Sequence, residues 1–358
     1  MAKRVLIAPL DWGMGHTTRM IALAECMEEL GAKVIFALPL NQQKLLNEYG
    51  FECVNVPGYN IKYYKIFSPT LSLILQSPKI LFKFFQEKYW ATKLARSLNI
   101  DIIISDNRPF FRSKHALSVY VTHQVNIQQK GIAGQIIQKP HRFLIDKFDC
   151  CLIPDSTNNQ FAGALSNAAL LKSPSIFVGP LSRFRSSVNR EVQEKTNFTL
   201  AVIASGPSPW RDLFIQSVID ELSTMEGNFV VIGALPTNKT NKKRAQVGNI
   251  TLTGHLPTAQ FYEILASSKT IFSLAGYTTI MDMAIIGKPL IMMATPKQGE
   301  QEYLVQHLRQ QPGYYPINNI AEIRNVVNKT MQPPISVDLG ILEQSCVSLL
   351  QMAKKTKN

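Results

Sequence analysis

The sequence predicts an α/β protein built from two doubly wound, Rossmann-like domains, and three observations lead to this prediction. A chain of 358 residues is longer than a domain with one hydrophobic core usually is. Short apolar runs alternate with longer amphipathic runs, which is typical of strand–helix repeats around a parallel sheet. A polar, proline-marked stretch at 181–197 separates two such series. We therefore expect an N-terminal domain at 1–180, a linker at 181–197, a second domain at 198–335, and a final helix and basic tail at 336–358 that packs back on the first domain.

Runs rich in Val, Ile, Leu and Phe, bounded by turn residues, mark the strands. In the first series we expect strands at 5–9, 33–38, 52–56, 102–105, 118–122, 151–153 and 176–178. In the second we expect them at 199–204, 229–232, 250–253, 270–274 and 290–293. Helical periodicity predicts helices at 17–30, 41–49, 80–98, 135–148, 210–221, 259–266, 278–286, 301–309, 320–328 and 338–352. If two such domains face each other, the carboxyl ends of their strands meet at one cleft.

The composition indicates a folded cytoplasmic protein. Hydrophobic residues make up 46% and charged residues 18%, which fits a globular chain. The N-terminus runs directly into a strand, so we expect no signal peptide, and no apolar run is long enough to span a bilayer. The five cysteines lack zinc-type spacing and are expected as reduced core thiols. We expect neither a metal site nor a cofactor.

The formal net charge of +13 calls for an anionic partner. Basic and aromatic residues alternate over 59–96, where Glu87 is the one acid. This pattern suits a surface that faces anionic lipid, on the inner face of the plasma membrane. The alternative is that the aromatics face the domain core and the lysines are merely solvated. We expect a membrane surface or an anionic substrate as the partner, and no nucleic acid.

A glycine turn after the first strand contains the candidate base of the first domain. The turn contains Gly13, Gly15 and His16 and opens the first helix. A dinucleotide site is not favoured, because the third glycine is absent and no acid follows the second strand. A neutral imidazole at a helix start can act as a general base near neutral pH. The alternative is that His16 only caps the helix.

Further polar residues follow other strands of the first domain. Asp106 could orient His16 or itself take the proton, and His123 could bind an acceptor hydroxyl. Either could instead satisfy loop backbone groups. The expected acceptor side consists of Gly13, Gly15, Arg19 and His123.

The segment 271–303 predicts a nucleotide-sugar site in the second domain. A strand leads through a tight turn into a helix, whose first N–H groups and dipole suit a phosphate. Asp282 lies one turn further along the helix and can accept hydrogen bonds from a ribose. Turns after other strands of this domain could contact the diphosphate or the nucleobase of the donor. The candidate donor residues are Ser205, Gly206, His255, Leu256, Ala275, Gly276, Tyr277, Thr278, Thr279, Asp282, Glu300 and Gln301.

These motifs resemble the family-28 glycosyltransferases, which include the enzyme that forms peptidoglycan lipid II and the galactolipid synthases. The similarity lies in the Gly276–Asp282 run, in Gly287-Lys288-Pro289, in Glu300-Gln301 and in the glycine turn before His16. It implies the GT-B fold and inverting, metal-independent transfer. It also implies that Asp282 binds ribose, that Gln301 with Glu300 or Glu302 holds the sugar, that Leu256 meets the base through its backbone, and that His16 is the base.

The chain departs from this pattern at three places. Leu274 stands where some relatives carry a phosphate-binding histidine, Asp282 replaces a glutamate, and the proline-rich turn Ser205–Trp210 replaces a glycine-rich one. Taken together, we predict transfer of a hexose or N-acetylhexosamine from a nucleotide-sugar, UDP-linked by preference, to an acceptor hydroxyl. A lipid-linked or cell-envelope acceptor fits the basic segment. Two alternatives stay open: a UDP-sugar 2-epimerase on the same fold, and a non-catalytic sugar- or lipid-binding relative.

Overall fold

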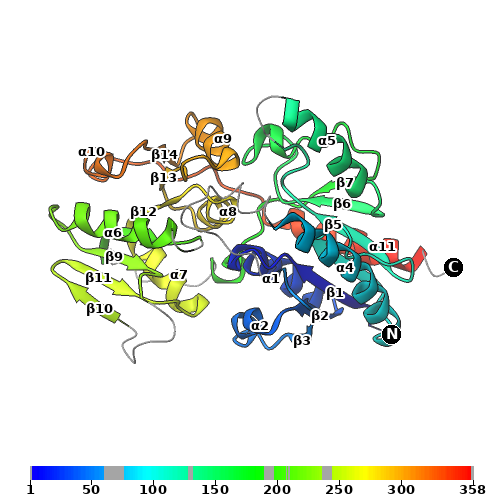
Figure 1. The fold of residues 1–358 in the computed structure, drawn as a ribbon. Helices are drawn as coiled ribbons and strands as arrows, with labels where there is room; N and C mark the ends of the chain where they lie inside the picture. Colours follow the sequence, from blue (N-terminus) through cyan, green and yellow to red (C-terminus); the bar gives the residue numbers. More distant parts are fainter. Residues whose placement is uncertain are drawn as a thin grey trace. The chain divides into compact units, whose positions relative to one another are not determined.

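The computed structural model describes residues 2–59, 76–127, 132–188, 197–206, 208, 210–235 and 244–355. These residues form two compact units (Figure 1). The first consists of the described residues up to Arg183 together with those from Asp338 onward, and the second runs from Phe184 to Val337. Most of the expected linker, at 189–196, lies outside the described residues.

The first unit is organised around a parallel sheet with the strand order β3-β2-β1-β4-β5-β6-β7. The strands are β1 (Arg4–Pro9), β2 (Lys33–Leu38), β3 (Glu52–Asn55), β4 (Ile102–Asp106), β5 (Leu117–Val121), β6 (Cys150–Ile153) and β7 (Ser175–Phe177). The central strands are buried along almost their whole length, as strands covered on both faces must be. The order reverses at β1, and β4 is its neighbour, so the turns after β1 and β4 lie side by side.

Helices cover both faces of this sheet. They are α1 (Met14–Glu29), α2 (Leu40–Leu46), α4 (Ser77–Ser97), α5 (Ile132–Ile145) and α11 (Gly340–Lys355). Helix α4 packs Ala91, Leu94 and Ala95 on β1, β2 and β4. The last helix, α11, packs against α1 and β7, so the end of the chain completes the first unit (Figure 1).

The second unit has a sheet with the order β10-β11-β9-β8-β12-β13-β14. Its strands are β8 (Phe198–Ile203), β9 (Phe229–Ile232), β10 (Arg244–Val247), β11 (Ile250–Thr253), β12 (Ser268–Leu274), β13 (Leu290–Met293) and β14 (Tyr314–Pro316). All neighbouring pairs are parallel except β10 with β11. Its helices are α6 (Trp210–Leu222), α7 (Thr258–Ala266), α8 (Tyr277–Ile286), α9 (Gly299–Leu308) and α10 (Ile323–Val326).

The fold class expected from the sequence is confirmed, with differences at the edges. The edge strands β10 and β14 were not predicted, because both are short and neither contains a run of aliphatic residues. Helix α1 begins three residues earlier than the expected start at 17, which brings Gly15 and His16 into its first turn. The expected helix at 320–328 is a short 3-10 turn, Ile320–Glu322, followed by α10. Within the described residues, no helix is long and apolar enough to cross a membrane.

Candidate functional site

Three adjacent strands of the first unit end in polar residues at one sheet edge. The β1–α1 turn holds Gly13 to His16, Asp106 is the last residue of β4, and His123 follows β5. Because β1, β4 and β5 are parallel neighbours, these residues meet. The sequence placed them on separate turns, and the structure brings them into one hydrogen-bonded cluster.

The cluster is centred on the carboxylate of Asp106, which is fully buried. His16 Nδ1 lies 2.9 Å from Asp106 Oδ2, and Arg19 Nε donates to the same oxygen at 3.1 Å. Arg19 Nη2 donates to the other oxygen, Oδ1. On its far side Arg19 Nη1 lies 3.3 Å from Nδ1 of His123. The cluster is therefore a buried carboxylate held by a buried cation, with His16 as its partly exposed member.

This geometry determines which nitrogen of His16 can take up a proton. An ionised carboxylate only accepts hydrogen bonds, so Nδ1 carries the hydrogen that His16 donates to Asp106. Arg19 Nη2 also lies 3.1 Å from this Nδ1, but a protonated Nδ1 cannot accept its hydrogen. The other ring nitrogen, Nε2, is then the basic one. His16 retains 22% side-chain exposure, so its ring is partly accessible from outside the cluster.

The electrostatic balance favours an ionised Asp106. Burial by itself would raise the pKa of this carboxyl, but the positive charge of Arg19 and the contact with His16 outweigh it, and the net pKa is lowered. Both oxygens are occupied and no part of the side chain is exposed. These facts argue against Asp106 as the base, which was one of the two sequence candidates. They favour a role in orienting His16.

Arg19 and His123 lie deeper than the sequence suggested. They were expected on the acceptor side, but their exposed fractions are 2% and 5%. Arg19, on α1, contacts all three other members of the cluster. Position 19 carries no sequence signal for this role beyond its place one helical turn after His16.

Two contacts that the sequence did not reveal support the glycine turn. Gly13 has φ +122°, ψ 172°, a backbone conformation that side chains with a Cβ rarely adopt. Gln42, on α2, accepts a hydrogen bond from Thr17 Oγ1 at 2.7 Å, and its amide donates to the Gly13 carbonyl at 3.4 Å. Gly13 itself is exposed, whereas Gln42 is buried. The buried side chain of Gln42 therefore fixes the start of α1, where His16 lies.

In the second unit, the expected donor turns lie at the carboxyl edge of the sheet. Strands β8, β12 and β13 are parallel neighbours, so the turn at Ser205 and Gly206, the turn at Ala275 and Gly276, and the loop after Met293 adjoin. Ser273 Oγ bonds the Ile203 carbonyl, and Ala275 N bonds the Met293 carbonyl at 2.9 Å, which ties these turns together. His255 and Leu256 follow β11, two strands away from β8; His255 is exposed and Leu256 is buried.

Helix α8 starts directly after the β12 turn, with a glycine at its N-cap. Its N-cap, Gly276, makes no side-chain hydrogen bond, and a Cβ built on it would meet no atom within 4 Å. The first-turn amides of a helix have no partner inside the helix, and the dipole makes this end positive. Tyr277 and Thr279 are buried, whereas Thr278 is half-buried. Asp282 lies one turn later with 7% exposure, so only its edge is accessible.

The polar loop after β13 is held by the residue expected to bind sugar. Gln301 Oε1 accepts a hydrogen bond from Thr295 N at 2.8 Å, and Gln298 caps α9 by accepting from Gln301 N at 2.6 Å. Lys297 N bonds Glu302 Oε1 at 3.1 Å. The oxygen of Gln301 thus shapes the loop. Glu300 stands half-buried in the first turn of α9.

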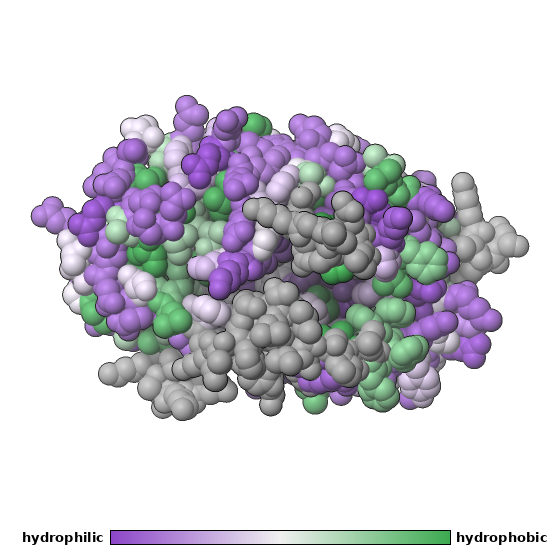
Figure 2. Space-filling view, turned by 45° about the horizontal axis from the view of Figure 1, so that its top comes forward, coloured by the Kyte–Doolittle hydropathy of each residue, from purple (hydrophilic) through white to green (hydrophobic). Residues whose placement is uncertain are grey.

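Helix α4 covers part of the basic–aromatic pattern, since 60–75 lies outside the described residues. One face of α4 packs on the core and another is exposed, and contact with lipid stays a prediction. Glu87 is buried and its Oε1 bonds Arg108 Nε at 2.6 Å. On the other face Phe82, Phe85 and Tyr89 are 63%, 76% and 62% exposed. Figure 2 shows hydrophobic residues, in green, standing among hydrophilic ones, in purple, on the surface.

Comparisons with known proteins agree with this architecture. No protein-family profile matches the chain. The chain is 22% identical over 327 residues to an uncharacterized glycosyltransferase of Methanosarcina mazei, which covers 84% of this chain and 82% of the relative. A second uncharacterized glycosyltransferase, from Methanosarcina acetivorans, is 22% identical over 326 residues, 84% of this chain and 81% of the relative.

Solved structures show the same fold over nearly the whole chain. The spinosyn rhamnosyltransferase SpnG, complexed with thymidine diphosphate, superposes with a TM-score of 0.60 at 12% identity, covering 98% of this chain and 96% of its own. Phytolacca americana UGT2, complexed with UDP-2fluoro-glucose and pterostilbene, superposes with a TM-score of 0.57 at 14% identity, covering 99% and 95%. Both comparisons agree on one class of protein, the glycosyltransferases, and the two seven-stranded units form the GT-B fold of that class. The narrower likeness to family 28 stays a prediction.

Proposed function

We propose that the protein is an inverting, metal-independent glycosyltransferase that moves a hexose or N-acetylhexosamine from a UDP-linked donor to an acceptor hydroxyl. The observation that supports this most directly is the hydrogen bond of 2.9 Å between His16 Nδ1 and the buried Asp106. It orients a base toward the outside of the first unit. A pure binding protein has no evident need for a base oriented in this way, and an epimerase would need its base beside the donor sugar.

In the proposed reaction, His16 Nε2 takes the proton of the acceptor hydroxyl. The oxygen attacks the anomeric carbon of the donor, a new C–O bond forms, and the bond to the leaving diphosphate breaks. Attack from the side opposite the leaving group inverts the configuration. Asp106 stabilises the imidazolium that forms at His16, because its own pKa is lowered and it stays ionised.

The second unit is proposed to hold the donor. The diphosphate would lie at the N-terminus of α8, beside Gly276 and Thr278, and at the turn of Ser205 and Gly206. There the backbone amides and the helix dipole would balance the charge that grows on the leaving group. The accessible edge of Asp282 would accept hydrogen bonds from the ribose, and Glu300 would contact the sugar.

The decisive experiment separates transfer from its alternatives. The protein is incubated with a panel of nucleotide-sugars, with and without lipid and glycan acceptors, and products are read by mass spectrometry. Transfer needs an acceptor, an epimerase changes the donor alone, and a binding protein changes neither. His16→Ala should lower transfer about 10²–10⁴-fold with UDP affinity unchanged, as loss of a general base does. Activity equal to that of the unchanged protein would refute the role of His16.

We also propose that α4 contacts an anionic membrane that presents a lipid-linked acceptor. Phe82, Phe85 and Tyr89 lie on one helical face, and the exposed charges of α4 are all positive because its one acid, Glu87, is buried against Arg108. Exposed aromatics flanked by lysines favour an anionic lipid surface.

Vesicle co-sedimentation tests this contact. Phe82→Ser with Phe85→Ser should reduce binding to phosphatidylglycerol vesicles at least about fivefold, since each phenylalanine contributes more than 1 kcal/mol of apolar burial. Leu170→Ser with Leu213→Ser removes two exposed apolar side chains elsewhere and serves as the control. Binding that ignores lipid charge, salt and both double substitutions would rule out the proposal.

A further inference from the structure

A cavity lies at the edge of the second unit, around the last strand, β14. Its volume is about 520 Å³, which lies within the range of small-molecule sites. It is lined by Arg309, Gln310, Gln311, Pro312, Gly313, Tyr314, Tyr315, Pro316, Val326, Lys329 and Gln332. The lining runs from residues 309–313, before β14, along the strand to Pro316. It includes none of the candidate donor residues, so the two places are distinct.

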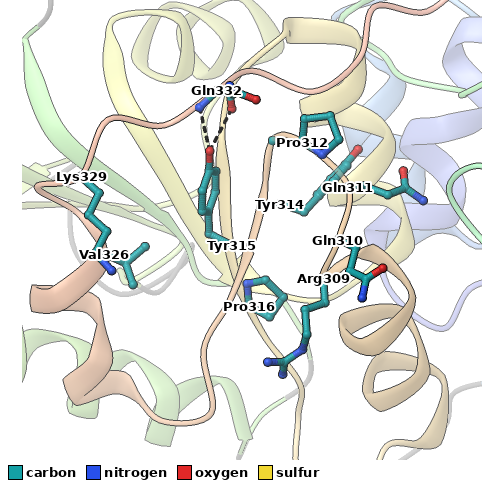
Figure 3. Close-up of a pocket in the computed structure, with 11 residues that line it drawn as sticks. Arg309, Gln310, Gln311, Pro312, Tyr314, Tyr315, Pro316, Val326, Lys329 and Gln332 are labelled. Atoms are coloured by element: carbon teal, nitrogen blue, oxygen red, sulfur yellow. Dashed lines mark hydrogen bonds between the residues drawn. The ribbon is translucent and has the colours of Figure 1, made fainter.

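The walls of this cavity are fixed by specific contacts. Gly313 has φ +88°, and a Cβ on it would lie 2.3 Å from Pro334 N, so only glycine lets the segment after α10 approach β14 this closely. Gln332 N donates to the Tyr315 hydroxyl at 2.7 Å, and that hydroxyl is 3.5 Å from the Gln332 carbonyl (Figure 3). These contacts fix the segment after α10 against β14.

The charges of the lining are all of one sign. Arg309 and Lys329 are its ionisable cations, and none of its described residues is acidic. Neither cation takes part in an ion pair with the described residues. Figure 3 shows Lys329 on one side of the Tyr315 ring and Arg309 on the other. Cations in a lining without an acid favour an anion; the fork of Arg309 matches a phosphate best, and Lys329 adds to the positive charge of the lining.

The rest of the lining indicates what the anion is attached to. The Tyr315 ring, Pro312, Pro316 and Val326 offer apolar faces, and the amides of Gln310 and Gln332 can exchange hydrogen bonds with hydroxyl groups. Apolar faces beside amides suit a hydroxylated ring. We propose that this cavity binds a small phosphorylated molecule with a cyclic, hydroxylated body, of sugar-phosphate size. The proposal does not depend on the function proposed above.

Calorimetry at low salt tests this site with two probes, glucose 1-phosphate and inorganic phosphate. Glucose 1-phosphate should bind more tightly than phosphate alone, because the ring adds contacts. Arg309→Ala with Lys329→Ala should weaken its binding at least tenfold, and the charge reversal Lys329→Glu should do the same. The matched control, Arg244→Ala with Lys269→Ala, removes one exposed arginine and one exposed lysine from strands of the same unit and should change it less than twofold.

A competition arm separates this site from the donor turns. Saturating UDP should leave the affinity for glucose 1-phosphate unchanged. The proposal is overturned if the unchanged protein binds neither probe, if UDP displaces glucose 1-phosphate, or if the two double variants weaken binding equally. UDP binding is measured in the same series. Loss of glucose 1-phosphate binding alone would contradict the cavity site, and loss of UDP binding alone would contradict the donor site.

Discussion

Replacing Asp106 by asparagine should damage both stability and catalysis, for separable reasons. Arg19 is 2% exposed and keeps its charge, so Asp106→Asn leaves a buried guanidinium without a carboxylate. Breaking a buried pair in this way costs about 3–5 kcal/mol. With an unfolding slope of about 2–3 kcal/mol per molar urea, the midpoint of the first unit should fall by about 1–2 M. An asparagine amide can also bond His16 in the wrong tautomer, which places the proton on Nε2 and removes the base.

The stability loss should depend on pH with a definite sign. The fold lowers the pKa of Asp106 below its ordinary value of about 3.9. Its contribution is therefore complete above the pKa of the unfolded chain and disappears as the pH falls through the lower, folded pKa. The difference in unfolding free energy between the unchanged protein and Asp106→Asn should stay constant from about pH 5 to pH 8 and shrink below about pH 4.

Urea unfolding followed by tryptophan fluorescence measures this loss. In a Trp210→Phe background the remaining tryptophans, Trp12 and Trp90, both lie in the first unit and report on it alone. Asp155→Asn is the matched control. Asp155 is also a fully buried carboxylate of the first unit, but it accepts hydrogen bonds from Phe161 N and Ala162 N at 2.9 Å and does not touch His16.

Three variants then give three different outcomes. Asp155→Asn should lower stability and keep the turnover of the folded protein, whereas His16→Ala should keep stability and lose turnover. Asp106→Asn should lose both. Unchanged stability in Asp106→Asn would show that Arg19 does not depend on this carboxylate, and turnover equal to that of the unchanged protein would refute its role in orienting His16.

The remaining predictions concern the donor site and are read by calorimetry with UDP. Gly276→Ala adds a methyl group into open space at φ −75°, so the free energy of unfolding should change by less than about 1 kcal/mol. If the phosphate approaches the backbone at Gly276, the same methyl group should lower UDP affinity about tenfold. Gly287→Ala, at φ 72°, should instead cost about 1–2 kcal/mol of stability and spare UDP affinity; the opposite pattern would place the phosphate elsewhere. Asp282→Ala should weaken UDP about tenfold, as loss of a hydrogen bond to a charged group does, and the exposed Asp220→Ala should not. Equal affinity in both aspartate variants would exclude Asp282 from the ribose contact.

The fold class could be predicted because the pattern it rests on is local. Buried parallel strands need unbroken runs of apolar residues, and β2, β9, β11 and β13 begin and end where those runs do. The edge strands β10 and β14 escaped prediction because they are short, and neither RAQV nor YYP is a run of aliphatic residues. The early start of α1 was missed for a related reason, since Gly13 allows a turn that propensity alone does not locate.

The sequence by itself determined the alternation of strands and helices and the placement of candidate residues such as His16, Asp106 and Asp282 at strand ends. Only the tertiary structure decided what these residues contact. Arg19 is a buried cation between Asp106 and His123, and the side-chain oxygen of Gln301 accepts a hydrogen bond within its own loop. Some aromatic side chains of α4 pack on the core, whereas others are exposed. The reason is that strand and helix patterns depend on neighbours along the chain, whereas a hydrogen-bonded cluster depends on which strands the topology sets side by side.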